Sequence, residues 1–399
     1  MFRSVALGIW VKTGSRNETL ESNGISHMIE HMLFKGTERF SAKDIADRFD
    51  GIGGHVNAFT AKEYTCYYAK VLDQHTETAI DLLSDMFFRS LFAVEELEKE
   101  RNVILEEISM YEDTPDDAVH DLIFQAGFGN HSLGYPIIGS RENVQRFQSE
   151  DLKKYMNKWY RADDLVISIA GKIDNKLLDL IEDYFGKVPL SGTPDVIKQA
   201  EISPNHLVID KKTEQHHFCF SLPGIKHNDP QMFSMAVLTN LLGGGMSSRL
   251  FQEVREKRGL AYSVYSYHSA MIDSGMFTVY AGTAPKQSDQ VAKIIMDTLK
   301  DVVINGVNET EVHRCREQMK GSFILGLESS HSRMNRIAKN ELLGLQHLQV
   351  DDVLAKIDAV SVQTVNDLVQ SKFRAPLSSA WVGHFSKRKE DWKRGNWYE

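Results

Sequence analysis

The sequence predicts an α+β protein built from two homologous domains, each a mostly antiparallel sheet packed with helices. Three observations predict this fold class. The chain has 399 residues, which is long for one hydrophobic core and enough for two. Strand-like and helical segments follow one order in the first half and recur in that order in the second. A stretch rich in proline, glycine and serine, 189–194, separates the halves.

The first half begins with a strand-like run and continues through paired helices to a final strand. Its second predicted helix, 41–49, places Ile45, Ala46 and Phe49 on one face. A glycine-rich turn at 51–54 then leads into alternating residues that predict a strand. The predicted elements are a strand at 4–13, helices at 25–34 and 41–49, strands at 55–60 and 64–71, helices at 75–89 and 94–111, and a strand at 164–171.

The second half repeats this order and predicts a second domain at 206–399, after a first domain at 1–188 and a linker at 189–205. A chance likeness between two α+β domains is the alternative, but strands, paired helices and glycine turns recur together, which favours duplication. The predicted elements are a strand at 218–222, helices at 231–242 and 247–257, strands at 262–268 and 275–281, and helices at 288–303 and 309–326.

Composition excludes several classes of function. The chain is 42% hydrophobic and 25% charged, and its net charge of −9 includes no basic tract, which argues against nucleic-acid binding. No apolar run reaches the roughly 20 residues of a membrane span. Cys66, Cys219 and Cys315 are far apart, which is typical of a reducing compartment, so a cytoplasmic protein is expected. The chain begins directly in a strand-like segment, and we expect a preceding strand to be missing.

The sequence His27-Met28-Ile29-Glu30-His31 is the most specific chemical signal in the chain. Two histidines four residues apart project from one helix face, so both imidazoles can reach one metal ion. Glu30 borders the same face and can touch a metal-bound water. This H-x-x-E-H pattern inverts the H-E-x-x-H zinc helix and predicts a zinc peptidase. A register that matches Phe34-Lys35-Gly36 with Leu241-Leu242-Gly243 places Ser234, Val237 and Leu238 at the motif positions of the second half, which therefore lacks the metal chemistry.

A catalytic zinc with two histidines needs a third protein ligand. The predicted helix at 94–111 is rich in acid, and Glu100 and Glu107 are seven residues apart, hence on one face. An acidic, solvated helix surface is the alternative interpretation, and patterning alone leaves the choice of ligand open. The acidic candidates are Glu95, Glu96, Glu98, Glu100, Glu106 and Glu107.

Over essentially its whole length the chain resembles the insulinase/pitrilysin clan of inverzincin peptidases, family M16. It is most similar to the short-chain subfamily that includes mitochondrial processing peptidase β-subunits. Besides the H-x-x-E-H motif, the resemblance rests on four segments. They are Gly53-Gly54-His55-Val56-Asn57-Ala58-Phe59-Thr60, Leu105-Glu106-Glu107-Ile108, Gly243-Gly244-Gly245-Met246-Ser247-Ser248-Arg249-Leu250 and Arg255-Glu256-Lys257-Arg258-Gly259-Leu260-Ala261-Tyr262.

The resemblance implies a role for each site residue of the first half. Glu107 becomes the third zinc ligand beside His27 and His31, with one Zn²⁺ per chain. Glu100 becomes a carboxylate that orients a ligand. Glu30 becomes the general base that takes a proton from the attacking water.

The resemblance also implies residues that contact the substrate. Asn57 and Ala58 lie on an edge strand to which an extended peptide adds by backbone hydrogen bonds. Arg255 and Tyr262 of the second half bind the carbonyl oxygen as negative charge builds on it. Arg258 is a nearby rival for Arg255. His55, His216 and His217 are assigned no metal role.

The leading hypothesis is a zinc endopeptidase that hydrolyses short, unfolded peptides. In the family two bowl-shaped halves enclose a chamber, and this chain supplies one half of that clamshell, so a homodimer, or else a heterodimer, is implied. One alternative is a processing peptidase that acts on specific precursors. Another is a non-catalytic assembly subunit of a larger complex. Peptides are the expected partners, with neither nucleic acid nor membrane.

Overall fold

The computed structural model describes residues 3–186, 198–385 and 397, and the chain forms two compact units. Each unit combines helices with a largely antiparallel sheet, which confirms the predicted α+β class. The first unit comprises Met1–Ser109, Tyr135–Lys198 and Leu325–His347. The second unit comprises Met110–Gly134, Gln199–Ile324 and Leu348–Glu399.

The first unit is built on a four-stranded sheet in the order β2-β3-β1-β4, in which every neighbouring pair is antiparallel. Helices α1 and α3 pack on one face of this sheet and supply many of the buried apolar side chains of the first core. The strands are β1 (Ser4–Val11), β2 (His55–Thr60), β3 (Thr65–Leu72) and β4 (Leu165–Gly171). The helices are α1 (Ile25–Met32), α2 (Ala42–Gly51), α3 (Thr76–Arg89), α4 (Val94–Glu112), α6 (Arg141–Arg146), α7 (Ser149–Trp159) and α8 (Asn175–Phe185).

The second unit repeats the topology of the first. Its sheet has the order β5-β9-β6-β8-β7, so β7-β8-β6-β9 corresponds to β2-β3-β1-β4, which supports the predicted duplication. The additional strand β5 pairs with β9 in parallel. The strands are β5 (His206–Asp210), β6 (His216–Pro223), β7 (Ala261–Ala270), β8 (Gly275–Thr283) and β9 (Ser378–Gly383). The helices are α9 (Met232–Gly243), α10 (Ser288–Asn305), α11 (Glu309–Gly326), α13 (Val350–Asp358) and α14 (Val362–Lys372).

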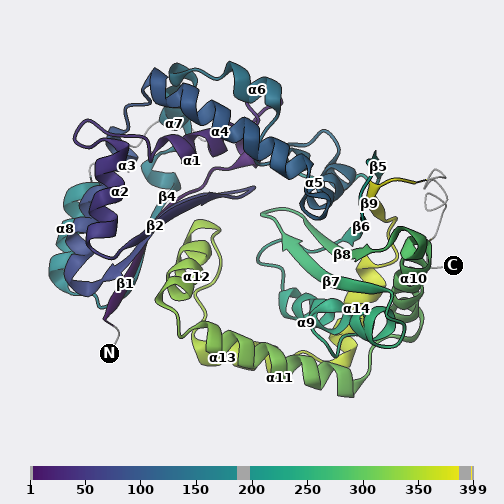
Figure 1. Cartoon of the computed structure of the whole chain (residues 1–399). Coiled ribbons are helices and arrows are strands. Elements are labelled where there is room, and N and C mark those ends of the chain that lie inside the picture. Colours follow the sequence, from purple (N-terminus) through teal and green to yellow (C-terminus); the bar gives the residue numbers. More distant parts are fainter. Residues whose placement is uncertain (1–2, 187–197, 386–396, 398–399) are drawn as a thin grey trace. The chain divides into compact units, whose positions relative to one another are not determined.

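Two helices pack against the sheet of the opposite half of the sequence. Helix α5 (Pro115–Phe128) follows the motif helices in the chain but packs on the second sheet, beside β6 and β9. Helix α12 (Ser330–Leu342) comes late in the chain but packs on β1 and β4 of the first sheet (Figure 1). Each sheet has a second apolar face. Helix α5 buries that face of the second sheet, and helix α12 buries that face of the first.

The compact units therefore differ from the contiguous spans predicted at 1–188 and 206–399. Positions 189–197 of the predicted linker lie outside the described residues. The other predicted elements match the observed ones closely, except that the segment predicted as a helix at 247–257 contains a π-helical stretch, Phe251–Glu256. The elements absent from the predicted set are α5, α6, α7, α8, α12, α13, α14, β5 and β9. None of the helices in the described part of the chain is both long and apolar enough to cross a membrane.

Candidate metal centre

Helix α1 carries the motif and is held firmly at its start. Gly24 precedes it at φ 100°, a conformation that favours glycine. The buried carboxylate of Glu18 accepts hydrogen bonds from the backbone N–H groups of Gly24 and Ser26, both at 2.9 Å. A negative charge at this end also suits the helix dipole. The helix buries its apolar residues in the first core and leaves the two imidazoles half-buried with ring centroids 4.7 Å apart.

Helix α4 brings Glu107 to both histidines. Its Oε2 lies 3.8 Å from His27 Nε2 and 3.6 Å from His31 Nε2. Among the described residues, these three side chains form the one cluster of histidine, cysteine or acidic groups placed to hold a metal ion. Glu107 Oε2 is buried and has no hydrogen-bond partner within the described part of the chain. Two imidazole nitrogens and an unpaired carboxylate oxygen are a donor set that suits zinc, so the residues fit the metal that the motif predicts.

Burial sets the charge state of the first ligand. It lowers the pKa of His27 to about 3, and the neighbouring charge of His31 acts in the same direction. His27 is therefore neutral near pH 7, which is the form that binds a metal. Burial also acts to lower the pKa of His31, but the hydrogen bond to Glu100 and the charges of Glu107 and Glu30 raise it on balance.

Glu100 lies behind His31, where the family resemblance implied a carboxylate that orients a ligand. Its Oε2 is 3.0 Å from His31 Nδ1, and its Oε1 is 2.7 Å from Lys35 Nζ. Burial acts to raise the pKa of Glu100, yet the hydrogen bonds from His31 and Lys35 lower it overall. Glu100 and Glu107 thus meet different nitrogens of one imidazole, although both occupy the same face of α4.

Glu30 lies beside the ligands and is held by a residue that the sequence analysis missed. Thr60 Oγ1, at the end of β2, donates a hydrogen bond of 2.5 Å to Glu30 Oε2. Burial raises the pKa of Glu30 and outweighs the opposing effect of this bond. The alternation of β2 could have identified Thr60. Val56, Ala58 and Thr60 share one face of the strand, and Val56 and Ala58 pack on the core that includes α1, so Thr60 faces the motif helix.

Strand β2 forms the outer edge of the first sheet, as the edge-strand prediction requires. The side chain of Asn57 accepts a hydrogen bond from the backbone N–H of Ala58 at 2.8 Å. That N–H therefore points away from β3 and is available to an added strand if the asparagine side chain moves aside. His55 is exposed on the same strand and lies outside the metal cluster. His216 and His217, in β6, contact Ser288 and Tyr280 respectively.

Arg255 and Tyr262 come together in the second unit. Arg255 Nη1 donates to the backbone carbonyl of Tyr262 at 3.0 Å, and its guanidinium lies 4.4 Å from the centroid of the Tyr262 ring. A shift in register between Ala261 and Ser263 makes Tyr262 the extra residue of a β-bulge. The bulge leaves this side chain 78% exposed, free to contact a ligand.

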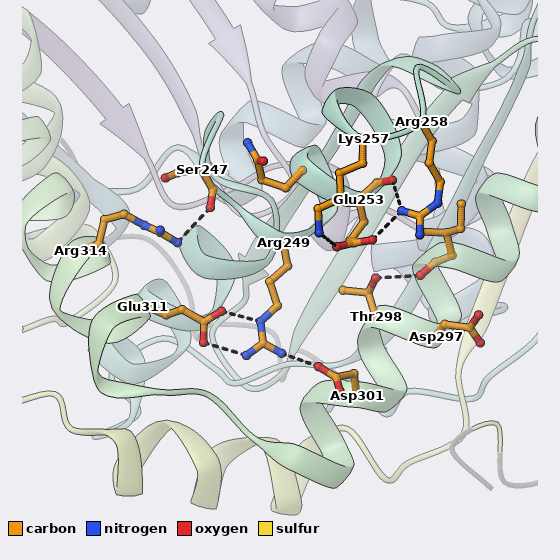
Figure 2. Close-up of a pocket in the computed structure, with 12 residues that line it drawn as sticks. Ser247, Arg249, Glu253, Lys257, Arg258, Asp297, Thr298, Asp301, Glu311 and Arg314 are labelled. Carbon is orange, nitrogen blue, oxygen red and sulfur yellow. Dashed lines mark hydrogen bonds and ion pairs between the residues drawn. The ribbon is translucent and has the colours of Figure 1, made fainter.

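The rival Arg258 has a different environment. It pairs with Glu253 at 2.5 Å and lines a cavity of about 540 Å³ in the second unit (Figure 2). Four basic and four acidic side chains line this cavity, so it has no excess charge to attract an ion. Arg249, for example, is held by Glu311 and Asp301. Arg258 is thus held by an acid of its own segment, whereas Arg255 contacts Tyr262.

Two family models cover most of the chain. The model described as Insulinase (Peptidase family M16) matches residues 2–141, and the model described as Peptidase M16 inactive domain matches residues 146–319. The chain is 50% identical over 380 residues to the uncharacterized zinc protease YmxG of Bacillus subtilis, across 95% of this chain and 93% of the relative. It is 44% identical over 394 residues to an uncharacterized zinc protease of Streptomyces coelicolor, across 96% and 85%.

Two solved structures share the fold. A protease from Helicobacter pylori superposes with a TM-score of 0.88 at 21% identity, covering 95% of this chain and 94% of that one. A peptidase M16 inactive domain from Pseudomonas fluorescens superposes with a TM-score of 0.90 at 20% identity, covering 97% and 94%. Identities this low support a common fold and nothing finer.

Proposed function

Because this chain belongs to the insulinase family of peptidases, M16, we propose that it is a zinc endopeptidase that hydrolyses short, unfolded peptides. One observation carries the proposal. The buried Oε2 of Glu107 has no hydrogen-bond partner among the residues that the structure describes and faces the Nε2 atoms of His27 and His31. The carboxylate of Glu30 lies close enough to His31 and Glu107 to interact with their charges. The second unit has Ser234, Val237 and Leu238 at the equivalent positions, all buried, and offers no such ligands.

His27, His31 and Glu107 would hold one zinc ion per chain. Zinc bound by three protein ligands keeps a position open for water and lowers the pKa of that water from about 15.7 toward 7. The carboxylate of Glu107 would supply the one acidic ligand, beside the neutral imidazole of His27. Relatives named as zinc proteases support this choice of metal.

Glu30 would act as the general base and then as the general acid. It accepts the proton as water attacks the peptide carbonyl and delivers that proton to the leaving amine. Its pKa, raised by burial, makes the carboxylate a stronger base than an exposed glutamate. Thr60 fixes the side chain in place during both transfers.

The outer edge of β2 would hold the substrate as an added strand, through the backbone at Asn57 and Ala58. Main-chain hydrogen bonds grip an extended peptide of any sequence, whereas a folded protein cannot present one. Arg255 and Tyr262 are proposed to bind the carbonyl oxygen, on the strength of the resemblance and of their mutual contact. We also propose that the protein is cytoplasmic and acts as a homodimer.

Metal analysis together with a peptide-library digest tests the function. The wild type should contain about one zinc per chain and cleave many unstructured peptides. Glu30→Gln should retain zinc and lose hydrolysis, because the amide cannot accept the proton. Hydrolysis by Glu30→Gln at the wild-type rate would refute the catalytic assignment. Cleavage of basic precursor peptides at one defined bond would favour a processing peptidase instead, and a zinc-free, inactive wild type would favour an assembly subunit.

A further inference from the structure

Lys35 lies on the turn that ends α1 and is brought back toward the metal centre by local structure. The backbone N–H of Phe34 donates to His31 O at 3.2 Å, and that of Lys35 donates to Met32 O at 3.1 Å. These i→i+3 bonds tighten the last turn. Gly36 then ends it at φ 110°, in the left-handed region that favours glycine. The short turn places the Lys35 side chain next to its neighbour from α4.

That neighbour is Glu100, and Lys35 occupies one of its two oxygens. Lys35 Nζ is 2.7 Å from Glu100 Oε1, while Glu100 Oε2 is 3.0 Å from His31 Nδ1. The Glu100 side chain is only 7% exposed and that of Lys35 is 29% exposed. A carboxylate this buried is costly unless it is paired. The small free energy typical of exposed surface ion pairs therefore does not apply to the pair of Glu100 and Lys35.

We propose that Lys35 is a positioning residue for the zinc ligand His31, acting through Glu100. With Oε1 anchored by Lys35, the carboxylate cannot rotate, and Oε2 stays in line to accept from His31 Nδ1. A proton fixed on Nδ1 leaves the lone pair of Nε2 directed toward Glu107, where the zinc ion would be held. The inference rests on the proposed zinc site. It adds Lys35 behind Glu100, which in turn holds the ligand His31.

Positioning and simple charge make opposite predictions for the loss of this lysine. An ammonium group near the site repels Zn²⁺, so removing the charge alone would tighten zinc binding. Removing an anchor for Glu100 disorders the support of His31 and weakens zinc binding. Loss of a partner behind a ligand typically weakens metal affinity by roughly 10–100-fold, and Lys35 acts one step further away, so we expect about tenfold.

Competition with a chromophoric chelator measures the zinc Kd of the full-length protein. Lys35→Met should raise the Kd about tenfold, and Lys35→Arg, which keeps a donor for Glu100 Oε1, should restore most of the affinity. In a Glu100→Gln background, Lys35→Met should have no further effect, because its route to His31 is gone. Lys43→Met is the matched control, since Lys43 is an exposed lysine paired with Asp47.

Two outcomes would overturn the proposal. The first is a Kd in Lys35→Met that is unchanged or lower; if metal-free Lys35→Met then also loses thermal stability, the ion pair is purely structural. The second is an effect in the double variant equal to the sum of the single effects. A wild type that fails to bind zinc would instead refute the proposed function, and the inference with it.

Discussion

Replacing Thr60 with valine removes the hydroxyl that holds Glu30 and changes the side-chain shape very little. The bond is short, at 2.5 Å, half-buried and directed to a carboxylate. Hydrogen bonds to charged groups contribute about 1.5–3 kcal/mol. If that whole amount is lost from transition-state stabilisation, kcat/KM falls by roughly 10–150-fold. Zinc affinity should not change, because Glu30 lies outside the ligand set.

Steady-state hydrolysis of a quenched fluorogenic peptide, with the zinc Kd measured in parallel, provides the assay. Thr60→Ser keeps the hydroxyl and should retain most of the activity, which makes it the matched control. The same hydrogen bond also makes Glu30 a weaker base, so its loss could in principle speed proton transfer. Activity in Thr60→Val at or above the wild-type level would refute the reasoning that orientation dominates.

Other changes test separate parts of the structure. Glu107→Gln should lower zinc content sharply, whereas Glu106→Gln, one residue away and exposed, should not; equal losses would contradict the ligand assignment. Met334→Ala, within the face of α12 buried on the first sheet, should lower the free energy of unfolding in urea by about 2–5 kcal/mol; a smaller loss would mean that α12 packs loosely. Burial raises the pKa of Glu18 in the folded state above its unfolded value, so the folded state binds this proton more tightly. The stability that the protonated carboxyl contributes is therefore lost as the pH rises from the unfolded pKa to the folded pKa. The stability of the wild type relative to Glu18→Gln should therefore fall with rising pH, and a constant difference between unfolding curves would contradict this.

Local sequence predicted the elements that carry the chemistry. The i, i+4 spacing of His27 and His31 requires only that the segment be helical, and an apolar face with a glycine at each end favours a helix there. The strand at 55–60 was likewise predictable, because alternation and a preceding glycine turn are properties of neighbouring residues. Such patterns depend on residues that are close in sequence, so they can be recognised without knowledge of the rest of the fold.

The choice among the acids of α4 could not be made from local patterning. Periodicity places Glu100 and Glu107 on one face of their own helix but says nothing of what lies opposite. The packing of α4 beside α1 decides the choice. It places Glu107 next to the Nε2 atoms of both histidines and Glu100 next to His31 Nδ1. Thr60 was missed for the same reason, since its partner lies on a different element.

The sequence alone determined that a zinc-type helix is present, that its second copy lacks the ligands, and that the protein is α+β. The tertiary structure decided which groups surround that helix and which helix covers which sheet. Helices α5 and α12 show why: an apolar helical face fits either exposed sheet face equally well by pattern. Pairing between distant segments is set by shape and burial across the whole chain, and no local spacing encodes it.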